Sequence, residues 1–139
     1  MKKFSLGLYF ALVILTLVSV SASTWDITQG GGKAEPLRIS FRPGADSASV
    51  SDRVRGDEEA EYVVAARAGQ QMFITVQTQP PGSVVVTVTD PDGSQVGVNR
   101  KGTDRWSAKL SGDGDYQLVV KKRKHDRVAS KYTMKVRIF

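Results

Sequence analysis

The residues most able to do chemistry are two arginines and a histidine in a basic segment near the end of the chain. Residues 121–127 read Lys-Lys-Arg-Lys-His-Asp-Arg, so Arg123 and Arg127 flank His125 and Asp126. Arginine grips a carboxylate through two parallel hydrogen bonds, so two arginines in one loop could bind acidic groups. His125 could act as a general base only if a partner oriented it. With cations on both sides, it is better interpreted as a solvated loop residue.

Three acidic motifs could hold a ligand or a substrate, but their spacing favours turns. Residues 90–93 (Asp-Pro-Asp-Gly) and 113–115 (Asp-Gly-Asp) resemble pieces of calcium-binding loops. An EF-hand loop needs a glutamate at its twelfth position, where this chain has Lys101. The acidic run at 57–61 could hydrolyse a glycoside only if two carboxylates faced each other across a cleft. We therefore interpret all three as solvated turns.

The composition excludes several classes of function. The chain has 139 residues and no cysteine, which rules out disulfides, thiol catalysis and thiolate zinc sites. Its single histidine rules out a multi-histidine metal site. No nucleophile–base pair is visible in the sequence. We therefore expect no enzyme activity, no catalytic residue, no metal and no cofactor.

Positive charge is concentrated in the last forty residues. The chain carries a formal net charge of +6, and residues 100–139 contain twelve Lys or Arg against four Asp. The densest part, residues 121–127, could be a solvated hairpin end, a site for phosphate-rich or acidic polymers, or a loop that enters an acidic cleft. Nucleic acid is not expected as a partner, because no aromatic stacking platform is interleaved with the basic residues.

The first 22 residues have the three parts of a secretory signal peptide. Two lysines form a short positive start, residues 6–18 are almost wholly apolar, and small residues follow at 19–23. The apolar run is shorter than the about 20 residues that span a bilayer, so we expect cleavage after residue 22 or 23 rather than an uncleaved anchor. The product would be periplasmic or secreted, without stable membrane insertion, and its charge would fall to +4 with the loss of the two lysines.

The rest of the chain alternates apolar and polar residues with a period of two, which is typical of half-buried strands. Turn sequences rich in Gly, Pro and Asp separate the runs, and no long window has helical spacing. We expect residues 23–35 to form a flexible arm and residues 36–139 to form an all-β domain, a single antiparallel β-sandwich of seven to nine strands. The alternating runs are 37–42, 48–50, 62–66, 72–77, 84–89, 116–121 and 132–139.

Four blocks, in order along the chain, form a recognisable pattern. They are Phe-Arg-Pro-Gly with a later Val-Arg-Gly (41–56), Tyr with an Ala-Gly-Gln turn (62–72), Gly-Asp-Tyr (114–116), and an Arg-x-x-x-Arg loop with a closing Tyr-containing strand (123–136). Together they resemble the periplasmic inhibitors of g-type lysozyme. The segments 62–72 and 90–93 are also similar to pre-peptidase C-terminal domains, which are β-sandwiches with varied roles.

The chain departs from the inhibitor pattern at two positions. Asp113 stands before Gly114 where the family has Ser, and Asp57 follows Gly56 where the family tends to have an aromatic residue. The resemblance places both positions near the binding edge. They are therefore the positions at which this chain would differ in affinity or choice of target.

The resemblance implies inhibition by occlusion of a lysozyme cleft, with a g-type lysozyme as the protein partner. A lysozyme cleft carries carboxyl groups that act on the glycosidic bond. Arg123 and Arg127 would pair with such groups, and Asp126 would brace an arginine. The lysines at 121 and 122 would act mainly on the association rate.

Three residues are expected to support this site: Tyr116, Gly114 and Asp57. Tyr116 would lie half in the core and use its hydroxyl as a hydrogen-bond handle. We expect a monomer or a weak dimer. The alternative function is that of a non-catalytic module that binds an envelope glycan or another anionic polymer.

Overall fold

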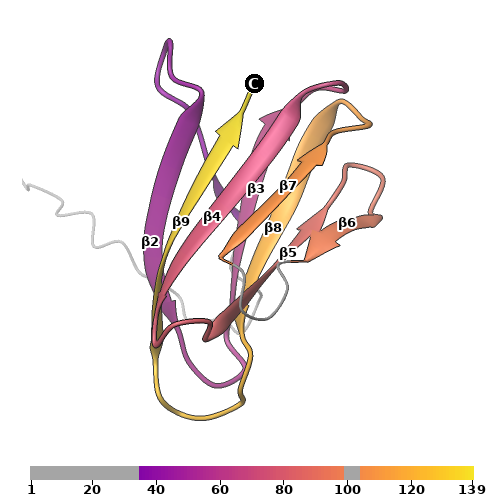
Figure 1. Ribbon diagram of the computed structural model, residues 1–139. Helices are drawn as coiled ribbons and strands as arrows, with labels where there is room; N and C mark the ends of the chain where they lie inside the picture. The colour runs from indigo at the N-terminus through magenta and orange to yellow at the C-terminus, as the bar shows by residue number, and fades with distance from the viewer. Residues whose placement is uncertain (1–34, 99–103) are drawn as a thin grey trace, which may run out of the picture. The chain divides into compact units, whose positions relative to one another are not determined.

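A computed structural model of the chain describes residues 35–98 and 104–139 (Figure 1). The predicted signal peptide and all but the last residue of the predicted arm lie outside the described residues. The described residues contain no helix, and therefore none that could cross a membrane. They form nine strands: β1 (Leu37–Arg38), β2 (Ser47–Val54), β3 (Glu59–Ala66), β4 (Gln71–Gln79), β5 (Val84–Thr89), β6 (Gln95–Val98), β7 (Arg105–Lys109), β8 (Gly114–Lys122) and β9 (Ser130–Ile138).

The strands form two sheets that share one core. Five strands follow the order β1-β3-β8-β5-β6, and four follow the order β2-β9-β4-β7. Strand β1 runs parallel to β3, whereas every other described pair is antiparallel. The prediction of an all-β sandwich of seven to nine strands is confirmed.

Strict alternation of burial along the central strands explains why the two sheets stack. Successive side chains of a strand point to opposite faces, so one apolar face per sheet can be buried. In β9 every second residue is buried from Ser130 to Ile138, and the residues between them are exposed. The core that results contains Ile39, Val54, Tyr62, Val64, Ala66, Met72, Ile74, Val76, Val84, Val86, Val88, Leu110, Tyr116, Leu118, Val120, Tyr132, Met134, Val136 and Ile138.

Two contacts join the sheets near their edges. The hydroxyl groups of Tyr62 in β3 and Tyr132 in β9 are hydrogen bonded at 2.7 Å, and burial raises the pKa of both phenols. Trp106 in β7 covers Gly97 in β6, so closely that a Cβ at Gly97 would lie 2.0 Å from the indole nitrogen. Gly97 is therefore required by the packing of Trp106.

Candidate functional site

The basic segment forms the loop between β8 and β9, residues 123–129, at one end of the sandwich (Figure 1). Two other turns touch this β8–β9 loop through backbone hydrogen bonds. Gly56 in the β2–β3 turn donates its N–H to the carbonyl of Asp126 at 3.1 Å. The N–H of Arg123 is donated to the carbonyl of Ser83, in the β4–β5 turn, at 2.9 Å. The loop therefore lies between two turns that belong to distant parts of the sequence.

A buried lysine holds the loop from inside. Lys122 continues the inward-facing series of β8, and its side chain is 3% exposed. Its ammonium group donates to the carboxylate of Asp126, to the carbonyl of Asp126 at 3.1 Å and to the carbonyl of Val128. A buried ammonium needs such partners, because an unpaired buried charge is strongly unfavourable. Lys122 thus holds the loop at two residues, Asp126 and Val128.

Asp126 pairs with Lys122, whereas the sequence led us to expect that Asp126 would pair with an arginine. The hydrogen bond from Lys122 holds the pKa of the Asp126 carboxyl below its usual range. The same carboxylate accepts the N–H of Val128 at 3.1 Å. We expected Lys122 to be a surface cation that acts on the association rate. This was wrong, because the alternation along β8 directs the Lys122 side chain toward the interior.

The acidic β2–β3 turn lies directly against the basic loop. The Asp57 carboxylate pairs with Nδ1 of His125, and both side chains are largely exposed. Glu58 accepts the N–H of Arg55 at 3.0 Å, which closes the turn on itself. As a result this end of the protein carries acidic and basic groups side by side. Asp57, which replaces the aromatic residue of the inhibitor pattern, takes part in holding the two loops together.

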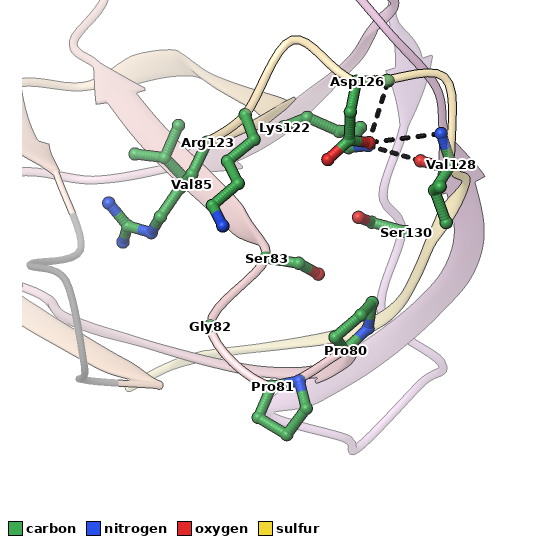
Figure 2. A pocket seen from close by; sticks show the side chains of 11 residues that line it. Pro80, Pro81, Gly82, Ser83, Val85, Lys122, Arg123, Asp126, Val128 and Ser130 are labelled. Carbon is green, nitrogen blue, oxygen red and sulfur yellow. Dashed lines mark hydrogen bonds and ion pairs between the residues drawn. The ribbon is translucent and has the colours of Figure 1, made fainter.

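Arg123 lines a hollow of about 740 Å³ between the β8–β9 loop and the β4–β5 turn. Figure 2 shows its guanidinium directed away from the Lys122–Asp126 pair. The β4–β5 turn contributes Pro80, Pro81, Gly82 and Ser83 to the lining of the same hollow. Arg123 is half-buried and forms part of the wall of this hollow.

Arg127 lies on the other side of the same loop. Its side chain is exposed and borders a separate, open hollow with Arg55, Gly56, Asp57 and Glu58. The two arginines are thus brought into one loop but line different hollows.

The structure does not bring Tyr116 and Gly114 to this site. Both lie at the start of β8, whereas the loop follows its end, about 20 Å further for Tyr116 at roughly 3.3 Å per residue. Tyr116 is fully buried, donates its hydroxyl to the carbonyl of Gly112 at 3.0 Å and accepts the N–H of Gly112 at 3.2 Å. It is therefore core and hydrogen-bond handle together, as predicted, but at the far end of the sandwich.

Asp113 and Gly114 also serve the fold at that far end. The Asp113 carboxylate accepts the N–H of Ala68 at 2.7 Å, which links the β7–β8 and β3–β4 turns. Gly114 has a φ of 133°, and a Cβ there would lie 3.1 Å from the ring of Pro91. Asp113 and Asp57 therefore lie near opposite ends of β8, and of the two only Asp57 lies beside the β8–β9 loop.

The remaining acidic motifs behave as turns. Asp90 in the β5–β6 turn accepts the N–H groups of Asp92 at 3.1 Å and Ser94 at 2.8 Å through its side chain. Gly93 follows with a φ of 87°, which favours glycine. Within residues 35–98 and 104–139, no group of three His, Cys, Asp or Glu side chains is placed to hold a metal ion.

No family model and no curated protein sequence matches the chain. Among solved structures, PliG from Aeromonas hydrophila, a periplasmic inhibitor of g-type lysozyme, superposes with a TM-score of 0.68 at 21% identity, covering 75% of this chain and 96% of that one. The chain has the fold of this inhibitor. PliG from Salmonella Typhimurium gives a TM-score of 0.60 at 20% identity, over 76% and 99% of the two chains.

A pre-peptidase C-terminal domain of a collagenase from Bacillus anthracis is also similar, with a TM-score of 0.54 at 14% identity over 76% and 95% of the chains. Both fold families named from the sequence blocks are therefore among the structural neighbours. The two PliG inhibitors superpose better than this domain does, and all three neighbours are covered over nearly their whole length.

Two parts of the site, Lys122 and the β4–β5 turn, were not predicted from the sequence. The buried position of Lys122 could have been predicted, because Lys122 continues the every-second-residue series of the buried Leu118 and Val120. A possible partner, Asp126, follows four residues later. The β4–β5 turn carried no comparable signal. Its residues read only as a turn, and their position beside Arg123 follows from the pairing of β5 with β8, in which Val84 lies opposite Lys122.

Proposed function

We infer that the protein is a periplasmic inhibitor that binds a g-type lysozyme through its β8–β9 loop. The observation that carries this proposal is the shared fold with two PliG inhibitors, over almost the whole length of each. The basic loop with Arg123 and Arg127 supplies the chemistry that such an inhibitor needs. The predicted signal peptide agrees with the periplasmic setting named for both neighbours.

Inhibition would proceed by occlusion of the cleft. A cleft that cleaves glycosides presents carboxyl groups, and a braced loop that enters it excludes both substrate and water. The Lys122–Asp126–Val128 contacts reduce the freedom that the loop would lose on binding. Arg123 and Arg127 would meet two separate acidic groups, since they line different hollows.

Local charge allows this loop to approach a basic partner. Lysozymes are often cationic, and a protein of net positive charge gains no long-range attraction to them. In this structure Asp57 and Glu58 stand beside the loop and offset part of its charge. The attraction is then local to the contact between each arginine and its carboxylate.

The test is a titration of purified mature protein against lysozymes of the g, c and i types, with cell-wall lysis as the readout. The proposal predicts saturable inhibition of the g-type enzyme at one-to-one stoichiometry and weaker effects on the other two types. Full lytic activity of g-type lysozyme in the presence of a tenfold excess of protein would contradict it. Binding to isolated cell wall without inhibition would favour the alternative, a glycan-binding module.

A further inference from the structure

The outward face of the β2-β9-β4-β7 sheet is strongly cationic. Residues directly opposite one another in neighbouring strands share a face, and the register assigns every outward position of this sheet. None of these outward positions on the four strands holds Asp or Glu. Six hold a cation, and we call this set the cationic face: Arg53, Arg105, Lys109, Lys131, Lys135 and Arg137.

The six cations are exposed and mostly lack acidic partners. All six residues are exposed. Among the described ion pairs, only that of Arg137 with Asp46, at 2.7 Å, involves a member of the set. The charge of Lys135 also acts on the Asp46 carboxylate. The other four cations, Arg53, Arg105, Lys109 and Lys131, belong to none of the described ion pairs and can attract an external anion.

The outward face of the other sheet has the opposite character. It carries three acidic residues, Glu59, Glu61 and Asp115. Its cations are paired, Lys121 with Glu59 at 2.7 Å and Arg38 with Asp115 at 2.5 Å. The charge asymmetry is therefore a property of one sheet face and not a consequence of net charge spread evenly over the protein.

Hydroxyl and amide groups fill the spaces between the cations. Ser49 lies opposite Lys135, and Ser51 is hydrogen bonded to Thr133 at 2.8 Å on the same face. Gln77 lies opposite Thr133 on the other side of β9. Neighbouring strands are about 4.8 Å apart, so these groups form a polar grid over which an extended polymer could lie. Such groups exchange hydrogen bonds with sugar hydroxyls between the points of charge contact.

The aromatic residues of this face do not offer a stacking platform. Phe73 and Phe139 stack on each other with ring centroids 5.5 Å apart and an angle of 10° between their planes. The Arg137 guanidinium carbon lies 4.8 Å from the centroid of Phe139. These rings are engaged within the protein, which disfavours the binding of single-stranded nucleic acid by base stacking.

We propose that the cationic face binds an acidic polysaccharide, a linear glycan that carries repeated carboxylate groups. This surface is separate from the β8–β9 loop and adds a second activity to the inhibitor. Charge contact at several positions makes such binding dependent on salt.

The test measures binding of polygalacturonate to the full mature protein at about 50 mM salt, with neutral dextran as the negative control. The variant Lys135→Gln/Arg105→Gln should bind at least about tenfold more weakly and show a smaller salt dependence. The matched control Arg42→Gln/Arg67→Gln removes the same charge from exposed turns and should stay within about twofold of wild type. Melting temperatures of both variants check that each folds.

Three outcomes would overturn the proposal. The proposal is wrong if the wild-type protein does not bind polygalacturonate. Equal losses in the two double variants would show an effect of net charge alone. Tighter binding to vesicles containing phosphatidylglycerol, with the same dependence on Lys135 and Arg105, would assign the face to a lipid surface. The loop variant Arg127→Ala should keep polygalacturonate binding, so a failure here is distinguishable from a failure of the inhibitor proposal.

Discussion

The ammonium group of Lys122 lies inside the β8–β9 loop and is held by Asp126, four residues later in the chain. The carbonyls of Asp126 and Val128 complete the set of acceptors around it. The loop that carries both proposed anchor arginines is therefore built around one buried charge. Loop shape and function should respond together to changes at this position.

Replacement Lys122→Met should lower both stability and inhibition. It removes the hydrogen bonds of a buried charged group, each of which contributes roughly 1.5–3 kcal/mol. Thermal unfolding of the free protein and the inhibition titration measure the two effects. The matched control is Lys121→Met, at an exposed position whose pair with Glu59 is half-exposed, where a change within about 0.5 kcal/mol is expected. Equal behaviour of the two variants would show that Lys122 does not hold the loop.

Acid should weaken the fold below the ordinary titration range of aspartate. Hydrogen bonds hold the pKa of Asp46, Asp115 and Asp126 below the unfolded value, which is about 3.9. Each carboxylate therefore contributes stability above that pH, and the contribution is lost as pH falls through the lower folded pKa. Urea midpoints should be nearly constant from pH 7 to 5 and fall below about pH 4.

The variant Asp126→Asn gives the control for this pH dependence. It cannot titrate at position 126, so its acid-induced loss should be smaller than that of wild type. An identical pH profile for the two proteins would mean that the Lys122–Asp126 pair does not contribute to stability.

Replacement Gly97→Ala should destabilise the fold without touching the loop. The new methyl group would overlap the Trp106 indole, and forced overpacking costs about 1–3 kcal/mol. Gly112→Ala is the matched control, because the nearest atom to its Cβ would be the Tyr116 hydroxyl at 3.9 Å. Chemical denaturation with Trp fluorescence measures both. A larger loss at Gly112 than at Gly97 would refute the packing argument.

Replacement Tyr116→Phe separates support of the fold from contact with a partner. It removes the hydroxyl that bonds both backbone groups of Gly112, at a cost of about 1–3 kcal/mol if they stay buried. Inhibition of g-type lysozyme should be unchanged at a temperature where the variant is folded. A variant of normal stability that has lost inhibition would instead place Tyr116 at the interface.

Most of the sandwich was predictable because its strands alternate strictly. The parity of residues 62–66, 72–76, 84–88, 116–120 and 132–138 gives the buried face of five strands, and the structure confirms each. Strands β6 and β7 were not predicted. Both strands are short. In the sequence Gly97 indicates the end of a strand, whereas in the structure it lies within β6 and is covered by Trp106.

The site was predictable in its residues but not in its geometry. The Arg-x-x-x-Arg spacing identified the loop, yet spacing alone does not tell which hollow each arginine lines. The run at 37–42 read as one strand, but only Leu37–Arg38 pair in the sheet, and Leu37 is 63% exposed. Long-range contacts such as Gly56 with Asp126 have no local sequence signal.

The most direct test of the central claim is a titration of g-type lysozyme with wild-type protein and three variants, Arg127→Ala, Arg127→Lys and Arg67→Ala. Arg127 is exposed, so its removal should leave thermal stability nearly unchanged. We expect Arg127→Ala to weaken inhibition by roughly 10- to 1000-fold, about 1.4–4 kcal/mol, Arg127→Lys to restore part of the loss, and Arg67→Ala to behave as wild type. Inhibition that is unchanged in Arg127→Ala, or equally weakened in Arg67→Ala, would contradict it.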